Sequence, residues 1–299
     1  MRACMLKQVC PTSFSPCQDQ AMKPPFHHAR TAPVLVAALV GGCATQPVEP
    51  IERQHDLRID VAKVDFGARG TLHIVQAQEP RLRIRARADV ANLIHIEEEA
   101  GRLHIRDPIR PRFAATSELL GFGHVYDEQA MYYLEIPTLA ELRLSGGPVR
   151  IGPFQVDGLA ITSDGHADIR VDDVNVSRFS LNTTMGSQVT VARLVADSVV
   201  LTASGNATIR VKDVDANSVE IRAHEYSDVS LEGRAANGNL TLSGSGSVTA
   251  PAWLAEHADI HAVGHSRALL SVGTKLVLDV ADRAKVDWLG SPVVQKALR

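Results

Sequence analysis

Residues 167–186 read ADIRVDDVNVSRFSLNTTMG, and the next two blocks of twenty, SQVTVARLVADSVVLTASGN (187–206) and ATIRVKDVDANSVEIRAHEY (207–226), repeat the pattern of its aliphatic residues. One alternating pair recurs at the same interval as Val149/Ile151, Ile169/Val171, Val189/Val191, Ile209/Val211 and Val229/Leu231. Two further sets keep that interval: Leu159/Ile161, Phe179/Leu181, Val199/Leu201 and Val219/Ile221, and the single positions Val174, Leu194 and Val214. An interval kept over so many copies predicts a repeat architecture.

The repeat predicts a β-solenoid. Alternate residues of a strand point to one face, so the aliphatic pairs point inward and stack on their copies one coil away, at about 4.8 Å. Turns are expected at Asp157-Gly158, Asp197-Ser198, Asn217-Ser218 and Asn237-Gly238, and small inward residues are expected at the corners, at Ala203, Gly205, Gly244 and Gly264. The interval slips by one residue near Leu240/Leu242 and resumes at Ile260/Ala262 and Ala268/Leu270.

The part of the chain before the repeat is also rich in alternating segments. Six of them lie between residues 57 and 138: LRIDV, GTLHIVQ, RLRIRAR, LIHIEEE, GRLHIRD and MYYLEIP. We interpret 57–110 as a β-rich section that caps one end of the solenoid, with a hairpin turn at Gly101, because solenoid ends need caps against edge-to-edge pairing. Residues 111–130 break the alternation and are expected to form a loop or a short helix.

The composition bounds the class of protein. With 299 residues, 45% of them hydrophobic, the chain can bury a large core, and its formal net charge of −3 gives no general attraction to nucleic acid. All four cysteines lie within the first 43 residues, at Cys4, Cys10, Cys17 and Cys43. A folded body beyond Cys43 therefore has neither disulfides nor thiolate metal sites.

The apolar run from Ala32 to Val40 is typical of an export signal. Its length of nine residues is far below the roughly 20 that a membrane-spanning helix needs, and Lys23 and Arg30 precede it. Because Met22 opens this pattern, we expect residues 1–21 to be a non-native extension or a disordered tail and residues 22–42 to be a lipoprotein signal peptide.

The run ends in Val40-Gly41-Gly42-Cys43, which resembles a bacterial lipobox. We therefore expect Cys43 to carry diacylglycerol and its amine a further acyl chain such as palmitate, which together anchor the protein to a membrane. Ala44 favours the outer membrane, and residues 43–56 are expected to be a tether before a single domain over 57–299. The alternative is an ordinary secretory signal in which the cysteine has no role.

Several segments, in this order, resemble the bacterial DUF2807 family, the GIN domain described as an autotransporter adhesin head. They are VDFGARGTLHIVQAQEPRLRIRA, GRLHIRD, MYYLEIPTLAELRLSG, LTASGNATIRV, LTLSGSGSVTA and VDWLGSPVV, and the resemblance covers about residues 57–295. It implies an all-β, right-handed β-helix on a secreted or envelope-bound protein, and it supplies no catalytic residues. The segment 111–130 departs from the family pattern.

Two clusters have the residue types of a catalytic or metal site. His257, His261 and His265 are four residues apart, but on a strand His261 and His265 point outward about 13 Å from each other, with His257 in the preceding turn, so we expect no metal ion. A second cluster is acidic: Asp164, Asp168, Asp172, Asp173 and Asp213. Paired carboxylates can hydrolyse glycosides, whereas Arg193 between Asp173 and Asp213 favours a ladder of ion pairs.

Two columns of polar residues are predicted on the solenoid surface. One contains Arg170, Thr190, Arg210 and Ser230, and the other Thr162, Asn182, Thr202 and Arg222. We predict a non-enzymatic, lipid-anchored protein of the cell envelope that binds a glycan or an envelope protein through Arg170, Thr190, Arg210 or Arg222, without a cofactor. The alternatives are a carbohydrate-active enzyme on the same fold and a structural subunit of an envelope assembly.

Overall fold

A computed structural model describes residues 50–107 and 130–296 of the chain. These residues are nearly all in β-strands, with one short helix, α1 (Ala88–Ala91). The predicted signal peptide, Cys43 and the segment 108–129 lie outside the described residues, and with them nearly all of the predicted loop or helix at 111–130. Among the described residues, none of the helical structure reaches the length and apolar character of a membrane-spanning helix.

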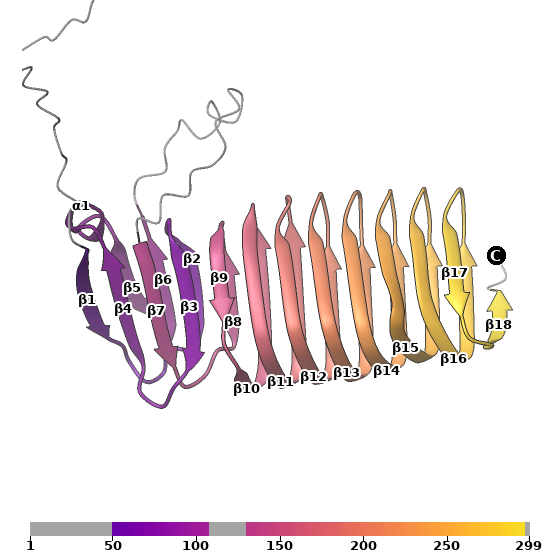
Figure 1. Ribbon diagram of the computed structural model, residues 1–299, viewed down its shortest axis with the longest axis horizontal. Helices are drawn as coiled ribbons and strands as arrows, with labels where there is room; N and C mark the ends of the chain where they lie inside the picture. The colour runs from indigo at the N-terminus through magenta and orange to yellow at the C-terminus, as the bar shows by residue number, and fades with distance from the viewer. Residues whose placement is uncertain (1–49, 108–129, 297–299) are drawn as a thin grey trace, which may run out of the picture. The chain divides into compact units, whose positions relative to one another are not determined.

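The repeat folds as the predicted β-solenoid, in which long bent strands stack in parallel (Figure 1). Ile169 lies beside Val189 and Val189 beside Ile209, so the register between coils is the 20-residue interval of the sequence. The stacked elements are β10 (Phe154–Asp164), β11 (Ala167–Thr184), β12 (Gln188–Ala203), β13 (Thr208–Ala223), β14 (Asp228–Leu242), β15 (Ser247–Ala262) and β16 (Arg267–Val280). All three predicted sets of inward aliphatic residues are buried, which confirms the predicted core.

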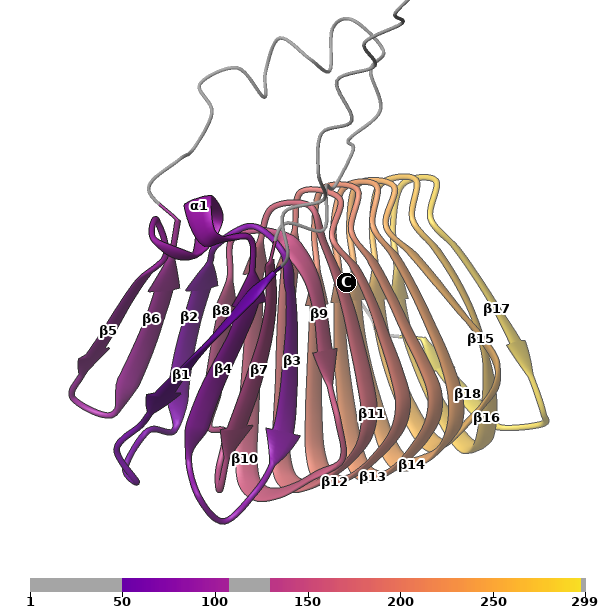
Figure 2. The same cartoon turned by 60° about the vertical axis from the view of Figure 1, so that its left-hand side comes forward.

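Each coil contributes to two sheets that face each other across this core (Figure 2). In β11 the segment 167–171 pairs with β9 (Gly147–Ile151), and we call the sheet that contains it the front sheet. In β10 the segment 160–163 pairs with β8 (Glu141–Leu144), and we call the sheet that contains it the back sheet. Burial alternates along each stretch of a coil and is interrupted by pairs of exposed residues where the strand bends. In β11 the pairs 172–173 and 177–178 leave a short third stretch, 174–176, between the front-sheet and back-sheet segments.

The predicted turns at the Asp-Gly and Asn-Ser pairs are wrong in one respect. Gly158, Ser198 and Ser218 sit at these bends, but the strand pairing continues through them, with Gly158 beside Arg178 and Ser198 beside Ser218. The hydrogen-bonded turns of the solenoid lie elsewhere, where the back-sheet segment of one coil leads into the front-sheet segment of the next, as at 184–187 and 204–207.

The small residues at these turns have two different roles. Ala203 is buried as predicted, but Gly205, Gly244 and Gly264 do not point inward: they adopt positive φ angles of 67°, 65° and 79° and form the turns themselves. The inward position of the turn belongs instead to the buried residues Ser187, Ala207, Ser227 and Ser266. Their small side chains let the chain reverse close to the core.

The predicted slip of one residue occurs at Gly233. Val211 lies beside Leu231, but Val214 lies beside Gly233, so the offset between these coils falls from 20 to 19 residues. Gly233 has a φ of +114°, and a Cβ atom there would lie 2.2 Å from the carbonyl oxygen of Val214. Only glycine fits this irregularity, because the backbones approach too closely for a side chain.

The N-terminal section forms the predicted cap. It contains β1 (Ile51–Asp56), β2 (Lys63–Gly67), β3 (Thr71–Gln76), β4 (Arg81–Ala86), β5 (His95–Glu99), β6 (Arg102–Arg106) and β7 (Ala130–Ile136). β1 and β7 flank β4 in antiparallel fashion, and β5 and β6 form the expected hairpin through Gly101. Because β1 begins at Ile51, the folded domain starts before the predicted boundary at 57, and residues 51–56 are not part of a tether.

The opposite end of the stack is built differently. Its last coil consists of β17 (Lys285–Leu289) in the front sheet and β18 (Val293–Lys296) in the back sheet, and both pair with β16 in parallel. No antiparallel strand lies across this end within the described residues (Figure 1).

Candidate functional site

The stacking of the coils brings three of the four predicted binding residues together. Arg170, Thr190 and Arg210 occupy the same position of β11, β12 and β13, and their side chains point outward from the front sheet. The fourth, Arg222, lies on the outer face of the back sheet and pairs with Glu220 at 2.5 Å between Nη2 and Oε1. The four residues therefore do not form one site.

The line of Arg170, Thr190 and Arg210 continues into the cap. Arg170 lies beside Arg150, Arg150 beside His73, His73 beside Tyr133, and Tyr133 beside Arg83. One row thus crosses seven adjacent strands, from β4 through β7, β3, β9, β11 and β12 to β13. We call these residues the basic row: Arg83, Tyr133, His73, Arg150, Arg170, Thr190 and Arg210.

An aromatic pair lies near the cap end of the basic row. The rings of His73 and Tyr133 stack with their centroids 5.2 Å apart and an interplanar angle of 17°, and the Arg83 guanidinium lies 5.7 Å from the Tyr133 centroid. Arg83 also forms an ion pair with Glu135, at 2.8 Å between Nη2 and Oε1. These contacts hold the side chains in place at this end of the row.

The pKa of His73 is lowered by burial and, to a lesser degree, by the positive charge of Arg150. The ring is therefore neutral at neutral pH, and it can donate from one nitrogen and accept at the other. The cap end of the row thus combines an uncharged aromatic pair with arginines on either side.

The arginines of the solenoid differ in their partners. Arg170 forms an exposed ion pair with Asp168, at 3.2 Å between Nη2 and Oδ2. Arg150 and Arg210 are exposed and form no ion pair with any described residue. Since exposed ion pairs contribute little, an anionic ligand can replace Asp168 as the partner of Arg170 and can reach Arg150 and Arg210 directly.

The predicted acidic cluster does not converge. Asp173 lies beside Arg193, and Arg193 forms an ion pair with Asp213 at 3.7 Å between Nε and Oδ2, which agrees with the predicted ladder of charges. Asp168 is on the front sheet, and Asp164 ends β10 in the back sheet. These carboxylates therefore do not face one another across a substrate-sized gap.

The three histidines are also separated. His261 is exposed on β15, as predicted, with Nδ1 2.8 Å from Oδ2 of Asp279. His257 is part of the same strand and not of a turn, whereas His265 lies in the turn after it and not on a strand. No three His, Cys, Asp or Glu side chains group closely enough to hold a metal ion in the described part of the chain.

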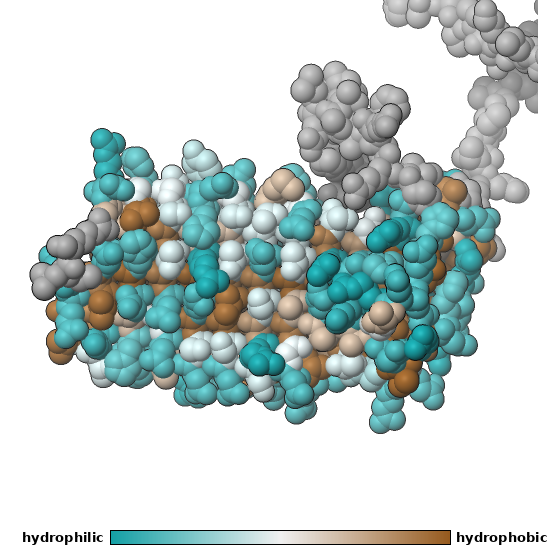
Figure 3. Space-filling view, turned by 180° about the vertical axis from the view of Figure 1, so that it is seen from behind, coloured by the Kyte–Doolittle hydropathy of each residue, from teal (hydrophilic) through white to brown (hydrophobic). Residues whose placement is uncertain are grey.

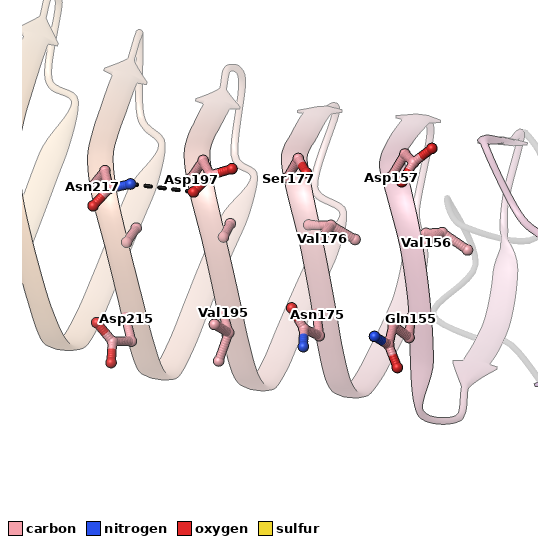
Figure 4. A pocket seen from close by; sticks show the side chains of 12 residues that line it. Gln155, Val156, Asp157, Asn175, Val176, Ser177, Val195, Asp197, Asp215 and Asn217 are labelled. Atoms are coloured by element: carbon pink, nitrogen blue, oxygen red, sulfur yellow. Dashed lines mark hydrogen bonds between the residues drawn. The ribbon is translucent and has the colours of Figure 1, made fainter.

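A shallow groove crosses four coils on the outer side of the second bend (Figure 4). Its floor is formed by Val156, Val176, Ala196 and Ala216, and its two rims by Gln155, Asn175, Val195 and Asp215 and by Asp157, Ser177, Asp197 and Asn217. On one rim Asn217 donates a hydrogen bond of 3.2 Å to Asp197. A bidentate hydrogen bond from Arg234 lowers the pKa of Asp215, so that carboxylate already has a partner.

A network of charges covers the cap on the back sheet, where hydrophilic side chains gather in the space-filling view (Figure 3). Arg102 donates to Asp65 at 2.6 Å and to Glu141 at 2.7 Å, and His104 lies 3.1 Å from Asp65. Burial opposes ionisation of Glu141, but the hydrogen bond and charge of Arg102 more than offset it and lower the pKa of Glu141. Because its members satisfy each other, this network joins β2, β6 and β8 and is not an open site.

The sequence did not predict the cap half of the basic row or the groove. Arg83, Tyr133 and His73 lie outside the 20-residue repeat, and the antiparallel placement of β4 is not visible in the sequence pattern. The groove had a usable signal in the residues Val156, Val176, Ala196 and Ala216, which share the 20-residue interval.

Comparison with known proteins identifies relatives of the whole domain. The model of DUF2807, described as "Putative auto-transporter adhesin, head GIN domain", matches residues 61–193 and 180–292. No curated protein matches the chain.

Solved structures similar to this chain share its fold at low sequence identity. A "putative adhesin" from Bacteroides fragilis is 17% identical with a TM-score of 0.52, covering 83% of this chain and 97% of its own. A "putative adhesin" from Parabacteroides merdae is 13% identical with a TM-score of 0.56, covering 84% and 97%. A "Putative lipid binding protein" from Parabacteroides distasonis is 15% identical with a TM-score of 0.51, covering 83% and 92%.

Proposed function

The chain belongs to the DUF2807 family of adhesin-like head GIN domains, and from this premise we propose that it is a non-catalytic binding protein of the cell envelope whose basic row holds an acidic glycan. The observation that carries this proposal is the alignment of Arg150, Arg170 and Arg210 on one flat face, with Thr190 between the last two. Adjacent strands are about 4.8 Å apart, so the row offers cations at intervals of one or two strand spacings.

The chemistry of the row suits a polymer with repeated negative charges. An exposed guanidinium binds a carboxylate, sulfate or phosphate through two parallel hydrogen bonds, and several such contacts in line add up although each is weak. Thr190 adds a hydroxyl that can bond to a sugar, and the stacked pair of His73 and Tyr133 adds apolar surface.

The alternative of a carbohydrate-active enzyme on this fold has less support from the geometry. Hydrolysis by two carboxylates requires them to flank one bond, at about 5–9.5 Å from each other. In the described residues the acidic side chains singled out by the sequence are spread over both sheets and their bends, and Asp168 and Asp213 have arginine partners.

We further propose that Cys43 is lipidated and anchors the domain to a membrane, in agreement with the lipobox-like sequence before it. Metabolic labelling of cells with an alkynyl fatty acid tests this directly. We expect label on the wild-type chain, and we expect Cys43→Ser to remove the label and release the protein from the membrane fraction. Membrane-bound label on the Cys43→Ser chain would contradict the assignment.

Binding is tested with purified full-length chain that carries Cys43→Ser, on a panel of acidic and neutral polysaccharides that includes peptidoglycan. We expect saturable binding to acidic glycans, weakened by salt, without release of products. The triple change Arg150→Ala, Arg170→Ala and Arg210→Ala is expected to weaken binding at least tenfold, since each lost charged contact contributes on the order of 1 kcal/mol.

Two control variants separate the basic row from the other surfaces. Arg222→Ala removes a partly exposed arginine from the back sheet, and Asp197→Ala together with Asn217→Ala alters the groove. We expect both variants to bind as the wild type does. Normal binding by the triple variant, equal binding of neutral glycans, or glycan cleavage that the wild type alone performs would each overturn the proposal.

A further inference from the structure

The C-terminal end of the solenoid exposes the end of the aliphatic core. The inward residues of the last coil are Val286 and Trp288 on β17 and Val294 on β18, which lie beside Ala268, Leu270 and Leu276 of β16. Those three residues of β16 are fully buried, whereas Trp288 and Val294 are 37% and 38% exposed. The difference arises because within the described residues no further coil covers the last one (Figure 1).

This end also has an unpaired strand edge in the described part of the chain. The backbone N–H of Lys285 donates to the carbonyl oxygen of Ser266 at 3.0 Å, and that of Arg283 to Gly264 at 2.9 Å. Successive residues of a strand direct their N–H and C=O groups to alternate sides. The odd-numbered residues of β17 therefore bond toward β16, and Val286 and Trp288 direct their groups toward the open edge, whereas the N–H of Ala284, just before the strand, donates to the carbonyl oxygen of Ala281 at 3.3 Å.

This alternation limits how β17 can pair with β17 of a second copy. In an antiparallel pair, residues whose N–H and C=O groups face the partner lie opposite each other, so even-numbered residues must meet even-numbered residues. Four registers near the middle of the strand meet this condition, with Lys285, Val286, Asp287 or Trp288 opposite its own copy. The first places two lysines opposite each other and the third two aspartates, and both are disfavoured. The fourth sets Lys285 opposite Ser291 and Asp287 opposite Leu289, so it provides no complementary charges.

The register centred on Val286 is complementary in both charge and size. It places each Lys285 opposite Asp287 of the other copy on the outer face. On the inner face it places Val286 opposite Val286, and each Trp288 opposite the small Ala284. We propose that two copies of this chain associate end to end through β17 in this register, which joins their front sheets and covers both exposed core ends.

This contact is symmetric and closes on itself. A two-fold axis through the Val286 pair, perpendicular to the front sheet, relates the two copies, so the same surface is used twice and no third copy can add. The cap keeps its antiparallel strands at the far ends of the dimer. The contact is small beside the roughly 1,600 Å² of a standard interface, so we expect reversible association in the micromolar range.

The test is a concentration series of full-length chain with Cys43→Ser, followed by sedimentation velocity and by tryptophan fluorescence. Trp253 is buried in the core and Trp288 is exposed at the end, so dimer formation is expected to shift emission to the blue and protect Trp288 from acrylamide. A chain that remains monomeric at the highest soluble concentration would overturn the proposal.

The exposed pair of Lys285 and Asp287 provides a test that does not risk the fold. Lys285→Asp or Asp287→Lys alone places like charges opposite each other and is expected to weaken association roughly tenfold. The double variant Lys285→Asp with Asp287→Lys restores opposite charges and is expected to associate as the wild type does. If the single changes leave the dissociation constant of the dimer unchanged, or if the double variant does not regain the wild-type value, this register is excluded.

Val286→Pro separates edge pairing from simple apolar contact. Proline removes an N–H that faces the open edge and none that bonds to β16, so the coil keeps its ladder while the dimer loses its central hydrogen bonds. We expect this variant to be monomeric with an unchanged unfolding midpoint. A Val286→Pro chain that still dimerises would show that the end binds its copy without strand pairing and would refute the proposed contact.

Discussion

Trp253 and Gly238 offer a test of how the solenoid interior tolerates change. The inward column through Val199 and Val219 narrows to Gly238 and Ala258 in the next two coils. The Trp253 ring fills the space that these small residues leave: a Cβ on Gly238 would lie 2.6 Å from its Cη2 atom. The Trp253 ring thus supplies, at Gly238 and Ala258, the volume that valine side chains supply at Val199 and Val219.

The structure gives the sign and size of each change. Trp253→Val removes most of a fully buried ring and is expected to cost about 3–4 kcal/mol of unfolding free energy. Gly238→Val in the wild-type background forces the ring to move and is expected to cost about 1–3 kcal/mol. In the Trp253→Val background, a valine at position 238 fills part of the cavity left by the ring, as Val219 fills the same position one coil earlier. We therefore expect Gly238→Val to raise the free energy of unfolding by about 1 kcal/mol in that background.

Guanidinium unfolding followed by circular dichroism measures all four chains of this cycle. The control is Gly158→Ala, which meets only ordinary contacts at a distant bend and is expected to have the same effect in both backgrounds. If Gly238→Val lowers the free energy of unfolding by the same amount in both backgrounds, then the Trp253 ring does not occupy the space next to Gly238 in the way we infer.

Three further predictions concern individual side chains and the stability of the fold. Gly233→Ala combines a φ of +114° with a clash against a neighbouring backbone, and we expect a loss of at least about 2 kcal/mol in the same unfolding assay; a change below 0.5 kcal/mol would contradict it. Ser227→Ala removes a buried hydroxyl that has no hydrogen-bond partner among the described residues, and Ala207 occupies the same position one coil earlier. We expect this change to raise the free energy of unfolding by up to about 1 kcal/mol. A lower free energy of unfolding would contradict the absence of a partner for this hydroxyl. Burial and the charge of an adjacent arginine lower the pKa of both His55 and His73 in the folded chain. The unfolded chain therefore binds protons first as the pH falls below about 6.5, and the free energy of unfolding is expected to decline with acidification. Urea titrations at several pH values should show this decline, and it should be less steep after His55→Gln or His73→Phe.

The repeat was predictable because burial and register depend on the same residues. Ile169, Val189 and Ile209 must each face the dry interior, so their interval sets both the length of a coil and the alignment of its copies. The bends were not predictable as bends, because an Asp-Gly pair has the same composition whether the strand pairing ends there or continues through it. Gly205 was placed at the right corner with the wrong role, since composition does not distinguish an inward small residue from one with positive φ.

The solenoid half of the basic row was predictable from the sequence, and the cap half was not. Arg170 and Arg210 share the interval of the core, so the sequence alone aligns them. Arg83 and Tyr133 reach the same row through an antiparallel pair of strands that are about 50 residues apart in the chain, and that pairing depends on how the cap closes. A site assembled partly outside the repeat cannot be found from the interval of the repeat.

The alternation of side chains couples the basic row to the core. Arg170, Thr190 and Arg210 align because each follows a buried residue that is stacked on its copy, and a shift of one residue in any coil would exchange the two faces. The slip at Gly233 lies beyond Arg210 and is absorbed at a bend, where exposed neighbours allow the offset to change without turning an arginine inward. If the slip were moved to a coil between Arg150 and Arg210, it would break the row even if the solenoid still folded. The uniform offset of 20 residues across β9, β11, β12 and β13 is therefore the property on which a linear ligand depends, whereas the coils after Gly233 need only support the stack.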